Sequence, residues 1–498
     1  MEVLARNFTD GFKFIIDYYN KNKLFIKETI REYKKAKEKL GVEVSSDGVV
    51  IGFGYVLSGE DPGSPLVPAP IILDEESRKR NFLGLGTIGS GKTYLAMMLL
   101  EYDVYAGKPV IFIDPKPSIE ILNVVVWSVL EAGRHEDFRF MSFYHPEISY
   151  TINPLSRYFL PDELVSHLTS GIFVKDPFFL DVAKELTLVI VLFLYIKNIL
   201  GENMNYITIK DVLQYMVRAN FERLAEEFKE LSFEIARKHK SLISYTNALE
   251  NLIGLIKQSP VDYFSKVTTT LRVNLAQLSA GVAGKLLSNE DGENFCAEIE
   301  AGGRPVVFIQ LASLLNPDIT KRISRVIASM VRTLAGRVLG KGEKLNPPLS
   351  FIIDELANVL HLGFEESVNK AREAGVQYSA FAQTISKLSY EVGDKLLDDI
   401  LGNFNTILSF SVPDEKTAQY VSQRIGTARR MSVAVRYSEK QMFQLNETEK
   451  YLVEPSMLMN LEPRHFYFRN YKYVAFGKTA DFFVPPLEVE RDVSIGIY

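Results

Sequence analysis

Short apolar runs recur along the chain and alternate with longer stretches in which apolar residues return every three or four positions. A short run bounded by turn residues is typical of a buried strand, and the three-to-four spacing is typical of a helix. The runs that predict strands are residues 48–56, 71–73, 305–311, 349–353, 376–382 and 406–411. The stretches that predict helices between the later strands are residues 318–339, 364–374 and 414–425. This repetition favours an α/β fold with a mainly parallel sheet covered by helices on both faces.

The middle of the chain departs from this alternation. Residues 160–295 are helix-patterned and poor in alternating β-branched residues, so we expect an all-α domain inserted into the α/β domain. The predicted divisions are an N-terminal helical and strand segment (1–70), the first part of the α/β domain (71–158), the all-α insertion (159–297) and the second part of the α/β domain (298–498).

Composition and charge restrict the class of protein and the cellular compartment. The 498 residues are 47% hydrophobic and 24% charged, as in a globular chain, and the net charge of −5 excludes a uniformly basic nucleic-acid coat. The single cysteine, Cys296, excludes an internal disulfide and fits a reducing compartment. The longest apolar run, residues 186–196, is shorter than the roughly 20 residues that span a membrane. We therefore expect a soluble, cytoplasmic protein.

Residues 86–93 (GTIGSGKT) match the phosphate-binding pattern G-x-x-x-x-G-K-[ST] in full, between an apolar strand end and an apolar helix. The glycines of such a loop let backbone N–H groups turn toward phosphate oxygens, and the helix N-terminus adds partial positive charge. Lys92 is expected to reach the β- and γ-phosphates of ATP, and Thr93 to offer its hydroxyl to Mg²⁺. The residues predicted to bind the nucleotide are Gly86, Thr87, Gly89, Ser90, Gly91, Lys92, Thr93 and Tyr94.

Asp354 and Glu355 follow the predicted strand 349–353, and ligands of open parallel sheets lie at the carboxyl ends of the strands. We expect Asp354 to hold Mg²⁺ through water and Glu355 to act as the general base on the attacking water. Together with the phosphate-binding loop, the pair predicts a Mg²⁺-dependent ATP hydrolase.

Three more polar residues stand near the predicted strand ends. Gln383 ends the strand 376–382 and is expected to contact the γ-phosphate or the water; the alternative is a glutamine that caps a helix. Arg372 is placed to enter a neighbouring subunit's site, or is an ordinary surface arginine. Asp114 either closes a β-turn before a proline or helps to order the site.

Taken in order, these motifs resemble the TraD/TraG coupling proteins of type IV secretion and conjugation, relatives of the FtsK/HerA DNA pumps. The matching stretches are GTIGSGKT (86–93), FIDPK (112–116), TINPL (151–155), DELAN (354–358), AREAG (371–375) and GNFNT (402–406). The resemblance implies a RecA-like P-loop ATPase that forms a hexameric ring and moves DNA, usually single-stranded, toward a secretion channel. It also implies that Arg372 is an arginine finger acting in trans, that Gln383 is a γ-phosphate sensor, and that the helical insertion selects substrates.

The implied partners are DNA, a relaxase or other nucleoprotein substrate, and the proteins of a secretion channel or membrane, with the ATPase at the inner face of the membrane. Such proteins commonly begin with membrane-spanning helices, which we do not expect here. The stretch 21–39, with eight basic and three acidic residues, is either a solvated helix face or a dock for an acidic partner or anionic membrane surface. Two other functions remain open: a duplex-DNA pump of the FtsK/HerA type, and a protein-secretion or assembly ATPase.

Overall fold

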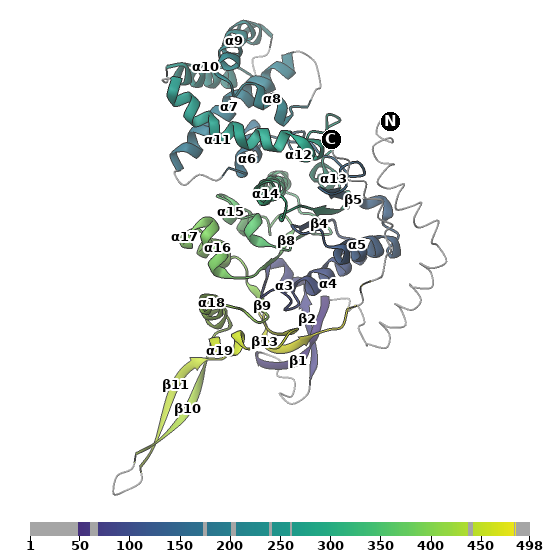
Figure 1. Ribbon diagram of the computed structural model, residues 1–498, viewed down its shortest axis with the longest axis vertical. Helices are drawn as coiled ribbons and strands as arrows, with labels where there is room; N and C mark the ends of the chain where they lie inside the picture. Colours follow the sequence, from purple (N-terminus) through teal and green to yellow (C-terminus); the bar gives the residue numbers. More distant parts are fainter. Residues whose placement is uncertain are drawn as a thin grey trace.

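The computed structural model describes residues 48–59, 68–172, 177–200, 206–238, 242–258, 261–436, 442–482 and 484. The helical part predicted for the N-terminal segment, with its basic stretch 21–39, lies outside these residues. Figure 1 shows an elongated molecule with a cluster of helices at one end, a large sheet in the middle and a β-hairpin that projects from the other end.

Within the described residues, eleven strands form one mixed sheet in the order β2-β1-β13-β12-β9-β3-β8-β7-β4-β6-β5. Seven neighbouring strands are parallel: β9 (Thr406–Ser409), β3 (Phe82–Leu85), β8 (Val376–Ala382), β7 (Leu349–Ile353), β4 (Val110–Asp114), β6 (Val306–Gln310) and β5 (Phe138–Ser142). The others add antiparallel pairings at one side: β12 (His465–Arg469), β13 (Tyr473–Thr479), β1 (Gly48–Gly59) and β2 (Ala69–Asp74). All six strands predicted from the first pattern are present.

Helices cover both faces of the parallel strands, because alternate strand residues point to opposite faces and both sets are apolar. Val110 and Phe112 of β4 pack in the cluster that contains α4 (Lys92–Tyr105) and α5 (Ile119–Glu131). Ile111 and Ile113 pack in the other cluster, under α14 and its neighbours. The helices of that second layer are α14 (Pro317–Gly340), α15 (Phe364–Lys370), α16 (Ile385–Val392), α17 (Asp394–Gly402) and α18 (Glu415–Ile425).

Every described element between β5 and β6 is a helix or a short turn. The helices are α6 (Pro161–Ser170), α7 (Pro177–Leu200), α8 (Ile209–Gln214), α9 (Arg218–Lys238), α10 (Ile243–Gln258), α11 (Val261–Ser279), α12 (Gly281–Leu287) and α13 (Phe295–Glu300). The apolar run 186–196 lies in α7, where Val189, Ile190 and Phe193 are fully buried. Among the described helices, none is both long and apolar enough to cross a membrane.

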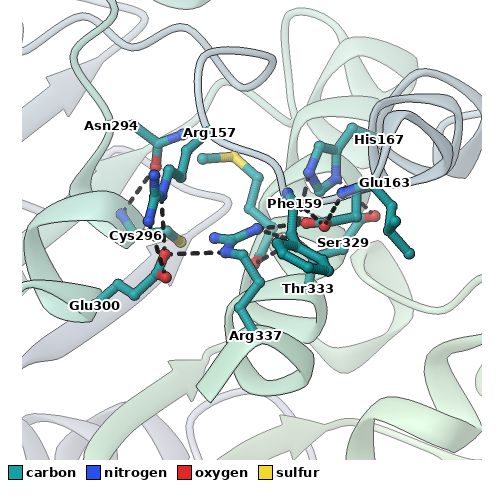
Figure 2. Close-up of polar contacts among 12 residues, drawn as sticks. Arg157, Phe159, Glu163, His167, Asn294, Cys296, Glu300, Ser329, Thr333 and Arg337 are labelled. Atoms are coloured by element: carbon teal, nitrogen blue, oxygen red, sulfur yellow. Dashed lines mark hydrogen bonds and ion pairs between the residues drawn. The ribbon is translucent and has the colours of Figure 1, made fainter. Parts of the chain in front are cut away.

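The junction between the helical part and the sheet is held by ion pairs around Arg337 of α14 (Figure 2). Arg337 bonds Glu163 of α6 through one nitrogen and Glu300 of α13 through another, at 3.0 Å. Glu300 also accepts from Arg157 at 3.1 Å and from Lys341 at 2.7 Å. Burial alone would raise the pKa of Glu300, but its three cations hold that pKa at about 2. Arg337 therefore links helices of both parts of the chain.

A second buried network lies at the amino ends of the parallel strands. Arg78 of the short helix α3 (Glu75–Lys79) and Asp103 of α4 form a bidentate ion pair, and neither side chain is exposed. Asp103 also accepts from Ser350 at 2.6 Å and pairs with Lys108 at 2.9 Å. Burial acts to raise the pKa of Asp103, but the charges of Arg78 and Lys108 prevail and lower it to about 2. The network ties α3, α4 and the start of β7 together.

The C-terminal region has two parts. Strands β12 and β13 complete the sheet beside β9, which the sequence left undecided. Between β9 and β12, strands β10 (Thr427–Arg436) and β11 (Met442–Tyr451) pair with each other and with no other described strand, and Figure 1 shows them projecting beyond α18 and α19 (Pro455–Met459).

Candidate functional site

The loop 86–91 joins β3 to α4 and has the geometry of a phosphate-binding loop. A Cβ atom on Gly86 would lie 2.6 Å from Ser90 Oγ and 2.8 Å from Phe410 Cβ, so only glycine fits there. Gly91 has a φ of 120°, a conformation that favours glycine, and its lack of a side chain leaves α4 without a side-chain cap. The first N–H groups of α4 are therefore available to the oxygens of a phosphate.

Lys92 lies across the mouth of this loop. Its Nζ donates to the carbonyl oxygens of Gly86 and Thr87, the latter at 2.7 Å. Burial lowers the pKa of Lys92 to about 8, although the charges of Asp354 and Glu355 act in the opposite direction. Thr93 and Tyr94 follow in the first turn of α4, both half-buried. The structure thus brings together the residues predicted to bind the nucleotide.

Two carboxylates lie at the carboxyl ends of the neighbouring strands β4 and β7. Asp114 is fully buried; its oxygens accept from the backbone N–H of Lys116 at 2.8 Å and of Ser118 at 3.1 Å, so it orders the turn before α5. Asp354 is 8% exposed, and burial together with Glu355 raises its pKa to about 6. Burial and the nearby Asp354 also raise the pKa of Asp114. A divalent cation bound between the carboxylates of Asp114 and Asp354 would stabilise their negative charges.

Glu355 is held by two side chains through one oxygen. Its Oε2 accepts from Gln383 Nε2 at 3.2 Å and pairs with Lys387 Nζ at 3.3 Å. Its Oε1 is buried and has no hydrogen-bond partner within the described chain. One oxygen is therefore held by two side chains, and the other is held by none of the described residues. Lys387, in the first turn of α16, was missed from the sequence, although it stands only four residues after Gln383.

Arg372 does not join this group. It is exposed, in the turn between α15 and β8, and its side chain has no hydrogen bond or ion pair with described residues. Arg372 precedes β8 and Gln383 follows it, so the seven residues of β8 (roughly 20 Å at about 3.3 Å each) separate them. Within a single chain, Arg372 thus lies at the amino ends of the parallel strands, and the loop 86–91 lies at their carboxyl ends.

Three residues that sequence reasoning missed, Phe410, Ser411 and Arg464, support the loop from the other side. Thr87 N donates to Ser411 O at 2.8 Å, and the ring of Phe410 lies 3.1 Å from where a Cβ on Gly91 would be. Arg464, just before β12, donates its backbone N–H to Ser90 O at 3.0 Å. These residues follow the loop by more than 300 positions, so no local pattern could have pointed to them.

The parallel sheet, the loop 86–91 at the end of β3 and the inserted helices define a RecA-like P-loop fold with an all-α domain. This fold is that of the conjugative coupling protein TrwB. The chain is similar to TrwB with a bound non-hydrolysable ATP analogue (TM-score 0.62, 16% identity, 89% of this chain and 98% of that one). It is similar to the unbound monoclinic form of the bacterial coupling protein TrwBdeltaN70 (TM-score 0.61, 17% identity, 85% and 89%) and to TrwB with ADP and Mg²⁺ (TM-score 0.60, 16% identity, 84% and 89%).

A second comparison supports the same relationship from the sequence. Residues 348–463 match the family described as the TraM recognition site of TraD and TraG. This segment runs from the start of β7 past Glu355, Arg372 and Gln383, includes the hairpin of β10 and β11, and ends after α19. No curated protein matches the chain in sequence. The resemblance to the TraD/TraG coupling proteins, predicted from the motifs, is confirmed by this match and by the fold.

Proposed function

We propose that the chain is an ATP-driven DNA translocase that works as a hexameric ring and delivers DNA or nucleoprotein to a type IV secretion or conjugation channel. The observation that carries the proposal is the meeting of Lys92, Asp354 and a Glu355 whose Oε1 is free, on a coupling-protein fold. TrwB structures hold an ATP analogue, a GTP analogue, and ADP with Mg²⁺, and we infer that this chain also binds a nucleoside triphosphate with Mg²⁺.

The donors of the site fit Mg²⁺, because Thr93 and Asp354 offer oxygen ligands and a cation relieves the repulsion between the buried carboxylates of Asp354 and Asp114. When bound, Mg²⁺ neutralises charge on the phosphates. Lys92 binds the β- and γ-phosphates beside it, and the N–H groups of the loop 86–91 hold their oxygens. Glu355 Oε1 accepts the proton of the attacking water while Gln383 and Lys387 keep the carboxylate oriented.

In a ring, a neighbouring subunit can supply the arginine that a single chain cannot bring to its own γ-phosphate. Because Arg372 lies at the opposite edge of the sheet from the loop 86–91, it cannot reach the γ-phosphate of its own chain, whereas it is exposed and free to enter a neighbour's site. We infer that Arg372 is the arginine finger in trans and that hydrolysis requires assembly. The partners we propose are DNA, single-stranded in preference to duplex, a relaxase or other nucleoprotein, and a channel protein at the inner face of the membrane.

The test is the steady-state ATPase rate of the full chain, alone and with single-stranded or blunt duplex DNA, at low and moderate salt. We expect single-stranded DNA to stimulate the rate, and the stimulation to fade as salt rises, because contacts to phosphates release counterions. Lys92→Ala removes the activity and is the control for contaminating enzymes. A preference for blunt duplex would favour the FtsK/HerA type of pump, and a rate that no DNA changes would contradict a nucleic-acid motor and favour a protein-secretion ATPase.

A further inference from the structure

The loop 86–91 follows β3, which lies between β8 and β9 in the sheet, so different strands flank the loop on its two sides. Strands β8 and β7, which carry Gln383 and Glu355 at their ends, lie on one side of β3, and strands β9 and β12 lie on the other. Because the γ-phosphate must lie beside Glu355, the rest of the nucleotide extends toward β9 and β12. Since β12 runs antiparallel to β9, its amino end stands at the same edge of the sheet as the loop.

Arg464 occupies that position in an unusual conformation. Its φ is 67°, and among non-glycine residues of the described chain only Asn81 shares a positive φ. Such a backbone conformation is strained for a residue with a side chain, and it persists only where surrounding contacts enforce it. Here the backbone of Arg464 donates to Ser90 O of the loop at 3.0 Å and accepts from Thr479 N at 2.9 Å. The strained residue is thus fastened between the phosphate-binding loop and the end of β13.

The guanidinium of Arg464 is also fixed. One of its nitrogens donates to Thr479 O and Ala480 O, each at 3.2 Å, and to the carboxylate of Asp481 at 2.6 Å. Its Cζ lies 5.8 Å from the centre of the Tyr94 ring, and the Phe482 ring meets Tyr94 edge-on at 6.3 Å. All three side chains are half-buried, so each keeps surface that a ligand can cover.

We propose that Tyr94, Arg464 and Phe482 form the platform on which the base of the bound nucleotide stacks. Tyr94 follows Thr93 in the first turn of α4, so the platform begins directly beside the phosphates. A planar guanidinium and two aromatic rings bind the face of a base and do not read its edge. The platform therefore accepts adenine and guanine alike, and binds the smaller pyrimidines less tightly. This inference rests on the proposed nucleotide site and adds the part of it that holds the base.

The test compares a ligand that has a base with one that has none. Binding of a non-hydrolysable ATP analogue and of inorganic tripolyphosphate, each with Mg²⁺, is measured by calorimetry on the full chain. The variants are Tyr94→Leu and Arg464→Asn; asparagine tolerates the positive φ and so preserves the backbone contact with Ser90. A matched control exists at the opposite edge of the sheet, where Arg80 Cζ lies 4.4 Å from the ring centre of Tyr471: Tyr471→Leu removes the same type of contact.

Each platform variant is expected to weaken the ATP analogue roughly tenfold and to leave tripolyphosphate within about twofold, while Tyr471→Leu changes neither. A guanine analogue should lose as much affinity as the adenine analogue. Equal weakening of both ligands would mean that the substitutions only disturb the loop, and no weakening would mean that the base binds elsewhere; either result overturns the platform. The nucleotide site itself is tested separately, since Lys92→Ala should weaken tripolyphosphate and the ATP analogue together.

Discussion

The buried ion pair of Arg78 and Asp103 allows a stability prediction that uses no ligand. In Asp103→Asn the carboxylate is replaced by a neutral amide, so the buried Arg78 loses its ion-pair partner and Lys108 keeps only its pairing with Glu75 at 2.6 Å. Removing one partner of a buried ion pair costs about 3–5 kcal/mol of unfolding free energy. The pKa provides a second figure: lowering it from 3.8 to about 2 corresponds to about 2 kcal/mol of stabilisation at neutral pH. We expect a loss of at least about 2 kcal/mol.

The measurement is urea unfolding followed by the fluorescence of Trp127. This is the only tryptophan in the sequence, it is 2% exposed, and it lies in α5, which packs beside the α4 that carries Asp103. Asp399→Asn, at an exposed position of α17, makes the same chemical change without burial and serves as the control. A loss within about 0.5 kcal/mol of the control would refute the reasoning.

The pH dependence of the same pair has a definite sign. Because the pKa of Asp103 is lowered in the folded state, its contribution is fully present above the unfolded value near 3.8 and is lost as pH falls toward 2. The difference in unfolding free energy between the natural chain and Asp103→Asn should therefore be constant from about pH 8 to 5 and shrink below about pH 4. A difference that stayed constant down to pH 3 would show that charge is not its source.

Three other predictions concern the site and the junction. Arg372→Ala should lower the ATPase rate by about 10³-fold, and mixing it with Lys92→Ala should restore part of the rate if the arginine acts in trans; a mixture with no more activity than its components would contradict this. Lys387→Met should lower kcat at least tenfold with little change in nucleotide affinity, because it leaves Glu355 Oε2 held by Gln383 alone; an unchanged kcat would exclude the orienting role. Arg337→Leu leaves the carboxylates of Glu163 and Glu300 without their shared arginine and should lower the thermal midpoint by several degrees, whereas Arg157→Leu at the 47%-exposed edge of the cluster should have a smaller effect.

The parts of the fold that the sequence predicted are those whose signals are local. The strands 349–353 and 376–382 are mainly apolar over five and seven residues, and the structure has both with the same bounds. The helix predicted over 364–374 ends earlier, at Lys370, because Gly375 adopts a φ of 90° and the chain turns into β8. The spacing of apolar residues does not indicate where such a turn ends a helix.

The parts that escaped prediction depend on contacts between distant residues. Gln383 and Glu355 could be placed at neighbouring strand ends, but their hydrogen bond and the pairing with Lys387 depend on side-chain conformations that only packing fixes. Arg464 reaches the loop because β12 enters the sheet beside β9, a pairing between strands that no residue spacing encodes. No local pattern marks Arg78 or Asp103 as buried, and both are enclosed only when the sheet and its helices pack around them.

The strand order has a consequence for synthesis on the ribosome. Among the described strands, β3 pairs only with β8 and β9, and β4 pairs only with β6 and β7. The first partner of β4 therefore begins at Val306 and the first partner of β3 at Val376. Synthesis proceeds at about 5–20 residues per second. Strand β3, which precedes the loop 86–91, and strand β4 therefore stay unpaired for roughly ten seconds or more while the helices α6–α13 are synthesised. Those helices contact one another locally and can form first. The nascent chain thus spends that interval with unpaired strands exposed to aggregation, and chaperone capacity should limit how much of this protein a cell can make in soluble form.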